Sequence, residues 1–219
     1  LKEVALKHGL TVVCMAKPLA KTPGSSMHIH QSVVHIDSGR NAFSDADGQP
    51  TETFYHFIGG QQACMADFTA LFAPNVNSYQ RLCHPYASPN NACWSEDNRA
   101  AGLRIPASSP VARRVENRLP GADANPYLAI AASLAAGLHG IEQRLQPAPA
   151  IQGEFEVPDN LSLPCTLHAA LDRLKRSSLA RELFGREFID GYHATKALEL
   201  TSFYDEITPW ERRVLAAQA

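Results

Sequence analysis

The chain has 219 residues, of which 45% are hydrophobic and 19% are charged, and its formal net charge is −2. This length supports one large domain or two small ones around a buried core. The near-neutral charge argues against a general nucleic-acid-binding surface, so the arginines are expected to serve local sites. No apolar run approaches the roughly 20 residues that cross a bilayer, and no targeting segment is recognised, which predicts a cytoplasmic protein without a membrane partner.

The cysteines are five in number and form no C-x-x-C pair. An odd number without such a pair argues against a disulfide framework or a structural zinc site. We therefore expect buried, reduced thiols at positions 14, 64, 83, 93 and 165.

The first 72 residues predict two strands between two helices. Residues 1–9 are typical of the last turns of a helix that ends at Gly9. Residues 10–16 are β-branched and apolar and predict a buried strand, and residues 27–37 predict a second strand of alternating character. Apolar residues at helical spacing then predict a helix over residues 52–72.

The rest of the chain predicts an irregular loop, three further strands and five helices. The loop covers residues 77–89, and the strands are expected at residues 92–94, 99–105 and 113–119. The helices are expected at residues 127–145, 167–175, 178–184, 186–201 and 209–217. Together these elements predict an α+β fold, in which a curved antiparallel sheet is backed by helices.

Charged residues alternate along the last of these strands. Arg114, Glu116 and Arg118 would all point to one face of it. A carboxylate between two guanidiniums offers Mg²⁺ an oxygen ligand and offers phosphate or carboxylate a bidentate partner. Ordinary solvent-facing charge is the alternative. Arg99 and Arg104 lie upstream, and so many arginines in one place favour an anion such as ATP or an amino-acid carboxylate.

A second polar face stands in the strand predicted over residues 27–37. His28, His30 and Ser32 would follow one another at about 6.6–6.8 Å along one side of that strand. Two imidazoles at this spacing suit a bimetal site or a metal-plus-phosphate site. Half-buried, hydrogen-bonded histidines are the alternative.

Four motifs in a fixed order resemble the catalytic domain of the glutamine synthetase family. They are GSSMHIHQS at residues 24–32, NSYQRL at 77–82, NRAAGLRIP at 98–106, and ARRVENRLP at 112–120 followed by ANPYL at 124–128. The likeness runs from the first residues to the C-terminal helices. It implies that residues 1–219 are the C-terminal portion of that domain, without the N-terminal β-grasp domain and the first part of the catalytic domain.

The resemblance implies an ATP-dependent ligase that joins the γ-carboxylate of glutamate to ammonia or an amine through a γ-glutamyl phosphate. It also implies Mg²⁺ or Mn²⁺, held by His28 and Glu116. The residues implied around the nucleotide are His30, Ser32, Arg104 and Arg114. Those implied to hold the amino-acid substrate are Gly24, Arg81 and Arg118, and Arg99 would neutralise the phosphoryl group during its transfer.

One position departs from the family in a way that bears on the acceptor. Glutamine synthetases have a Glu in the loop after the NSYQRL motif, where it binds and deprotonates ammonium. Counting from Arg81, Ala87 stands at that position here. A small neutral residue favours the branch that makes γ-glutamyl amines or polyamines such as γ-glutamylputrescine. The alternative is a substitute carboxylate at Glu96 or Asp97.

Two further alternatives concern the chain as a whole. The family's other metal-binding carboxylates precede the start of this sequence, so the alternative function is a truncated, non-catalytic homologue or fragment that binds nucleotide. Family members form stacked rings with sites between subunits. For this chain, a homo-oligomer and a form that has lost the ring contact both stay open.

Overall fold

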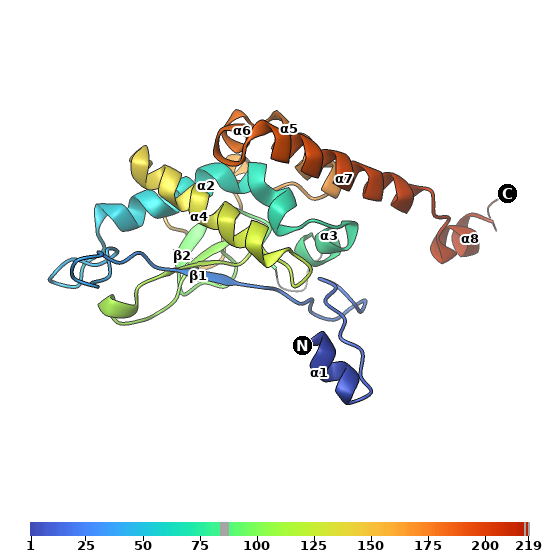
Figure 1. The fold of residues 1–219 in the computed structure, drawn as a ribbon, viewed down its shortest axis with the longest axis horizontal. Helices are drawn as coiled ribbons and strands as arrows, with labels where there is room; N and C mark the ends of the chain where they lie inside the picture. The colour runs from blue at the N-terminus through green and yellow to red at the C-terminus, as the bar shows by residue number, and fades with distance from the viewer. Residues whose placement is uncertain (84–87, 217, 219) are drawn as a thin grey trace.

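The computed structural model describes residues 1–83, 88–216 and 218, which form a four-stranded sheet with helices on one face (Figure 1). The strands are β1 (Ile29–Gln31), β2 (Trp94–Glu96), β3 (Leu103–Ile105) and β4 (Val115–Asn117). The α-helices are α1 (Lys2–Lys7), α2 (Glu52–Phe72), α3 (Val76–Leu82), α4 (Pro126–Glu142), α5 (Leu167–Arg176), α6 (Ser178–Phe184), α7 (Arg186–Tyr204) and α8 (Pro209–Leu215). Two short 3-10 turns cover Pro110–Ala112 and Asp159–Leu161.

The sheet has the order β1-β4-β3-β2, so β4 lies between β1, which comes much earlier in the sequence, and β3, which closely precedes it. It pairs antiparallel with both β1 and β3, whereas β2 pairs parallel with β3. The register sets His30 of β1 and Arg104 of β3 directly opposite Glu116 of β4. Three polar side chains from distant segments therefore share one row of the sheet.

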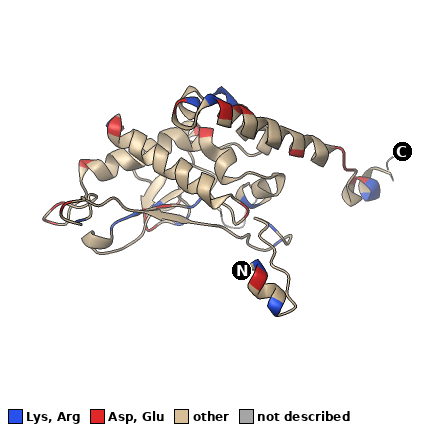
Figure 2. Ribbon diagram, viewed as in Figure 1, with Lys and Arg blue, Asp and Glu red and all other residues tan. Residues whose placement is uncertain are grey.

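The helices α2 and α4 form the layer that packs on the sheet (Figure 1). Thr51 caps α2 by accepting a hydrogen bond from the Phe54 amide at 3.3 Å, and Asn125 caps α4 by accepting one from the Tyr127 amide at 3.0 Å. Figure 2 shows that both helices carry few charges, as expected of helices that are largely buried. The outer helices α5 and α7 carry charges of both signs, and α7 runs outward to α8.

The core lies between this helical layer and the sheet. Its largest fully buried side chains belong to Phe43, Phe57, Phe68, Phe72, Ile58, Met65, Leu71, Leu103, Leu119, Leu174 and Ile189. Phe43 packs against both Phe54 and Phe57, with ring centroids 5.6 and 5.2 Å apart. The predicted α+β fold with a helix-backed sheet is confirmed.

Two local predictions are wrong. Residues 10–16 form no strand and, apart from Ala16, are largely exposed. The Ser25 amide donates to the Ala16 carbonyl at 2.8 Å, but no strand among the described residues pairs with this segment. The predicted loop over 77–89 begins instead with α3, which is fixed by a capping box in which Asn75 and Ser78 bind each other's backbone amides. Ala87 lies outside the described residues.

The strands also differ in detail from the prediction. β1 covers three residues of the predicted 27–37, and the chain then bends back through a bridge between Val34 and Asn41. The sheet is not wholly antiparallel, because β2 and β3 run parallel across the short connection of residues 97–102. In the described part of the chain, no helix is both long and apolar enough to cross a membrane.

The cysteines are all free, but only Cys64 and Cys93 are buried. Burial raises the pKa of the Cys64 thiol to about 12. Cys14, Cys83 and Cys165 are exposed, so the prediction of buried thiols is wrong for these three.

Glycines allow the close crossing of α2 and α4. A Cβ on Gly60 would overlap the Ala136 carbonyl and the backbone of Gly140 on α4, whereas a Cβ on Gly191 of α7 would meet nothing within 4 Å. We expect Gly60→Ala to lower the free energy of unfolding in urea by about 1–3 kcal/mol, because the helices would have to separate. The control, Gly191→Ala, should raise it by up to about 1 kcal/mol. Equal stabilities for the two variants would contradict this crossing.

Burial of the thiols can be tested by alkylation at pH 8. Iodoacetamide should label Cys14 in the folded protein, while Cys64 should label only after unfolding, because the thiolate reacts and burial suppresses its formation. Peptide mass spectrometry measures both sites in one sample. Labelling of Cys64 as fast as Cys14 in the folded protein would contradict the packing of α2.

Candidate active site

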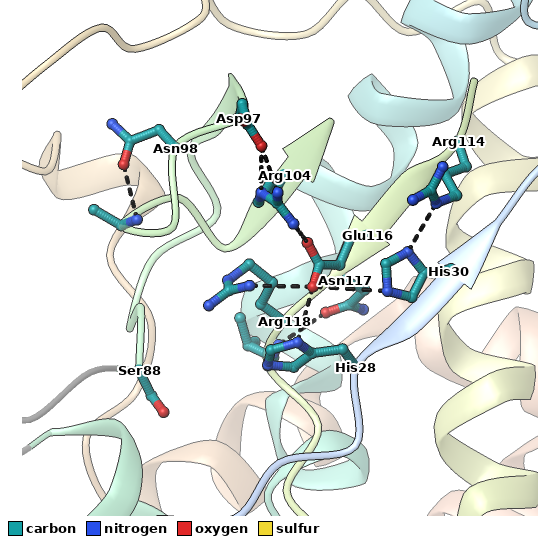
Figure 3. Close-up of polar contacts among 12 residues, drawn as sticks. His28, His30, Ser88, Asp97, Asn98, Arg104, Arg114, Glu116, Asn117 and Arg118 are labelled. Atoms are coloured by element: carbon teal, nitrogen blue, oxygen red, sulfur yellow. Dashed lines mark hydrogen bonds and ion pairs between the residues drawn. The ribbon is translucent and has the colours of Figure 1, made fainter. Parts of the chain in front are cut away.

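The centre of the site is the carboxylate of Glu116 on β4. Glu116 is buried, with 2% of its surface exposed. Its Oε2 accepts a hydrogen bond from Arg104 Nη1 at 2.9 Å, and its Oε1 accepts one from Arg118 Nη1 at 3.1 Å. The same Oε1 lies 2.8 Å from His28 Nδ1 (Figure 3). One buried carboxylate therefore joins two guanidiniums and an imidazole.

The surroundings of Glu116 keep it ionised. Burial alone would raise the pKa of this carboxyl, but the hydrogen bond from Arg104 and the charges of Arg118 and His28 outweigh burial and hold the pKa below its ordinary value. The pKa of His28 is also lowered, first by burial and then by Arg118, with Glu116 acting in the opposite direction. A neutral imidazole beside a carboxylate is a pair of groups that can ligate a metal ion.

Arg104 and His30 extend this network along the row. Arg104 is also bound by Asp97, which accepts hydrogen bonds from its Nε at 3.1 Å and from its Nη2. Arg114 Nε donates to His30 Nδ1 at 3.2 Å, so the hydrogen of His30 is assigned to Nε2, which lies 3.7 Å from Glu116 Oε1. Figure 3 shows Arg104 and His30 next to Glu116, with Asp97 bound to Arg104 and Arg114 bound to His30.

A second cluster lies around Arg81 of α3, which is 4% exposed. Its Nη1 donates to Ser88 Oγ at 2.9 Å and its Nη2 donates to the Leu119 carbonyl. Gly24 lies against this side chain so closely that a Cβ there would overlap it. Burial lowers the pKa of Arg81 to about 10, while the charge of Asp123 acts in the opposite direction. The hydrogen bond to the Leu119 carbonyl brings the Arg81 guanidinium to the residue that follows Arg118.

Two buried donors in these clusters are unused. Among the described residues, Nε of Arg81 and Nε of Arg118 have no hydrogen-bond partner. A buried donor without a partner costs free energy, so each is expected to meet an acceptor in the working protein. Two such donors on neighbouring cations suit the carboxylate of a small molecule.

The predicted site residues fall into three groups. The structure brings together His28, His30, Arg104, Arg114, Glu116 and Arg118 in one network, and places Gly24 with Arg81 beside it. Arg99 lies in an exposed turn after β2. Burial is the main cause that lowers the pKa of Arg118, and the charge of Arg99 adds only a little to it. Ser32 is exposed one residue beyond β1, and none of the described residues hydrogen-bonds its side chain.

The sequence does not predict the roles of two carboxylates at this site. Asp97, an alternative ammonium ligand by sequence, is an ion-pair partner of Arg104 in the structure. Asp123 accepts hydrogen bonds at the start of α3, the helix that carries Arg81. The turn sequence Pro-Gly-Ala-Asp after β4 was the available signal for Asp123.

Comparison with known proteins gives one consistent result. The model of the glutamine synthetase catalytic domain matches residues 1–215. The chain is 39% identical to glutamate–isopropylamine ligase of a Pseudomonas species over 96% of its own length and 47% of that protein's. It is also 39% identical to γ-glutamylethanolamide synthetase GlnA4 of Streptomyces coelicolor, over 97% of this chain and 45% of that protein. It is 38% identical to glutamine synthetase of Thermus thermophilus, over 96% of this chain and 49% of that protein.

A solved structure is similar as well. Apo GmaS without ligand matches 97% of this chain and 50% of its own, with a TM-score of 0.84 and 35% identity. The chain spans about half the length of the relatives that it matches.

Replacement of the central carboxylate tests the network directly. Glu116→Gln should lower the free energy of unfolding by about 3 kcal/mol, because Arg104 and Arg118 would lose the charge that compensates them in a buried place. Asp67→Asn is the matched control, since Asp67 pairs with Arg173 at the surface. This substitution should lower the free energy of unfolding by less than about 1 kcal/mol. Urea denaturation measures both, and equally small losses would rule out the network as a stabilising element.

Proposed function

This chain belongs to the glutamine synthetase family, and from that premise we propose that it works as an ATP-dependent ligase that joins the γ-carboxylate of glutamate to ammonia or an amine. The observation that carries the proposal is the ionised Glu116, held by Arg104 in the same row of the sheet and by Arg118 and His28 just beyond the strand ends. This arrangement combines metal-binding groups with fixed cations, as phosphoryl transfer requires.

For the nucleotide, we propose the outer part of this row. Arg114 and His30 are bound to each other and lie toward the edge of the network, while Arg104 lies across Glu116 from His30. Guanidinium groups suit phosphate oxygens because they donate two parallel hydrogen bonds. Ser32 would join them from the exposed end of β1.

For the acid substrate, we propose the second cluster. Arg81 and Arg118 would bind the α-carboxylate through donors that the described residues leave unused. Gly24 lets the Arg81 side chain lie against the backbone, because a Cβ there would overlap that side chain and the Ala16 carbonyl. The acid would then bind next to Glu116 and the proposed nucleotide region.

His28 and Glu116 fit part of a divalent-metal site. An imidazole nitrogen and a carboxylate oxygen lie 2.8 Å apart, and both groups are ligands of Mg²⁺ or Mn²⁺. The described residues hold no group of three or more His, Cys, Asp or Glu placed to bind a metal ion together. We propose that these two residues supply two of the ligands. A bound ion would neutralise charge on the phosphates of ATP.

The proposed reaction has two steps. A γ-carboxylate oxygen of glutamate attacks the γ-phosphorus of ATP, and the bond to the leaving oxygen of ADP breaks. An amine then attacks the carbonyl carbon of this acyl phosphate, phosphate leaves and the amine loses a proton. Arg99 would neutralise the phosphoryl group during the first step, since it lies in an exposed turn within reach of the charge of Arg118.

For the acceptor, we propose an amine larger than ammonia. One of the relatives above is named for the amine isopropylamine and another for an ethanolamide product, and a third, 38% identical, is γ-glutamylputrescine synthetase PuuA of Escherichia coli. Ala87 supplies no carboxylate for ammonium. Of the two alternative carboxylates, Asp97 is already paired with Arg104, and Glu96 is exposed at the end of β2.

We further propose a homo-oligomer in the cytoplasm, where ATP and glutamate are available. The arm formed by the end of α7 and by α8 leaves Leu198, Tyr204 and Trp210 exposed, and such side chains are expected at contacts between subunits.

Phosphate release measures the proposed activity. With ATP, Mg²⁺ and glutamate, the protein should release phosphate only when an amine is added, and putrescine or ethanolamine should act better than ammonium. Arg118→Ala should reduce the rate at least about tenfold, because it removes a cation from the acid site.

Two outcomes of this assay decide between the functions. Calorimetric binding of ATP without phosphate release for any amine would favour a non-catalytic nucleotide-binding homologue. A protein that does not bind ATP in the presence of Mg²⁺ would contradict both functions.

A further inference from the structure

Asp123 connects the loop after β4 to the start of α3. Its Oδ2 accepts hydrogen bonds from Asn75 Nδ2 at 2.9 Å and from Ser78 Oγ at 2.7 Å. Its Oδ1 is buried and has no hydrogen-bond partner among the described residues. A carboxylate in such a place is costly unless its charge is used.

Asn75 and Ser78 together fix the beginning of α3. Asn75 is the N-cap, and its backbone amide donates to Ser78 Oγ at 3.0 Å, so Ser78 accepts from the cap and donates to Asp123. Arg81 follows Ser78 by three residues and therefore extends from about the same side of the helix. The position of Asp123 thus sets the position from which the Arg81 side chain starts.

The loop that carries Asp123 also holds the segment that contains Gly24. The Ala122 amide donates to the Ser25 carbonyl at 3.1 Å, one residue from Gly24. Gly121 leaves room for the carboxylate, since a Cβ there would overlap Asp123 Oδ1. One short turn therefore touches both the helix of Arg81 and the chain beside Gly24.

Charge adds to this tether. Arg81 donates to the carbonyl of Leu119, the residue after Arg118, so the two cations lie close together. Burial lowers the pKa of Arg81 most, the charge of Asp123 raises it, and the charge of Arg118 lowers it further. Asp123 is thus a counter-charge that favours two guanidiniums near each other, as the binding of one carboxylate by both would require.

We propose that Asp123 is a positioning residue for the acid substrate, which holds Arg81 beside Arg118 through α3 and balances their charge without touching the substrate. This inference rests on the proposed assignment of Arg81 and Arg118 to the substrate carboxylate. It predicts a loss of affinity for the acid alone, whereas a purely structural role would weaken the binding of acid and nucleotide together.

The test is calorimetric titration of the chain with L-glutamate and, separately, with ATP and Mg²⁺. Asp123→Asn keeps the size and an oxygen that can accept from Ser78 but removes the charge. We expect its Kd for glutamate to rise about tenfold, as for the loss of a charged hydrogen-bond partner, and its Kd for ATP to stay within about twofold. Asp172→Asn, at an exposed pair with Arg176 on α5, is the matched control and should change neither.

Ser78→Ala is the second variant and decides the matter if Asp123→Asn fails to fold. It removes the hydroxyl but keeps the charge, so we expect an intermediate rise of about threefold in the Kd for glutamate, again without a change for ATP. Equal losses for both ligands, or no loss for glutamate, would overturn the positioning role. A wild-type chain that binds ATP but not glutamate would overturn it together with the acid-site assignment, while amine-dependent phosphate release tests the ligase activity separately.

Discussion

The sharing of one buried carboxylate, that of Glu116, by Arg104, Arg118 and His28 is the interaction on which the site depends. Two guanidiniums this close would repel each other in a buried place, and an isolated carboxylate there would take up a proton. Each charge is therefore stable only because the others are present. The site is held before any ligand arrives, so an entering phosphate or carboxylate meets cations that are already oriented.

The fold brings these groups together from distant parts of the sequence. β4 lies between β1 and β3, and that order sets His30, Glu116 and Arg104 side by side. Behind the sheet, α2 and α4 pack closely against each other at Gly60 and Gly140 and form the helical layer on which the strands lie. Next to the row, the turn after β4 ties α3 to the segment of Gly24 through Asp123. The proposed nucleotide and acid regions thus meet at Arg118, which follows Glu116 by two residues.

Much of this arrangement could be predicted from the sequence, because alternation along a strand is a local property. The side chains of Glu116 and Arg118 share a face as the spacing of two residues predicts, and helical periodicity predicted α2 and α4. The predictions that are wrong concern elements whose pairing depends on segments outside the local sequence pattern. Residues 10–16 have the composition of a strand but no neighbouring strand among the described residues, and β2 runs parallel to β3 across a very short connection. The role of Asp123 was missed for the same reason, since its hydrogen-bond partners lie 45 and 48 residues away in the chain.

We propose that this site activates a carboxylate by transferring a phosphoryl group to it. This transfer can be followed with glutamate that carries ¹⁸O in its γ-carboxylate, by mass spectrometry of the phosphate released in the presence of ATP and an amine. If the carboxylate attacks the γ-phosphorus and the amine then breaks the carbon–oxygen bond of the acyl phosphate, one ¹⁸O atom should be found in each phosphate formed. Unlabelled phosphate would mean that water, rather than the acid, receives the phosphoryl group, and would contradict the account.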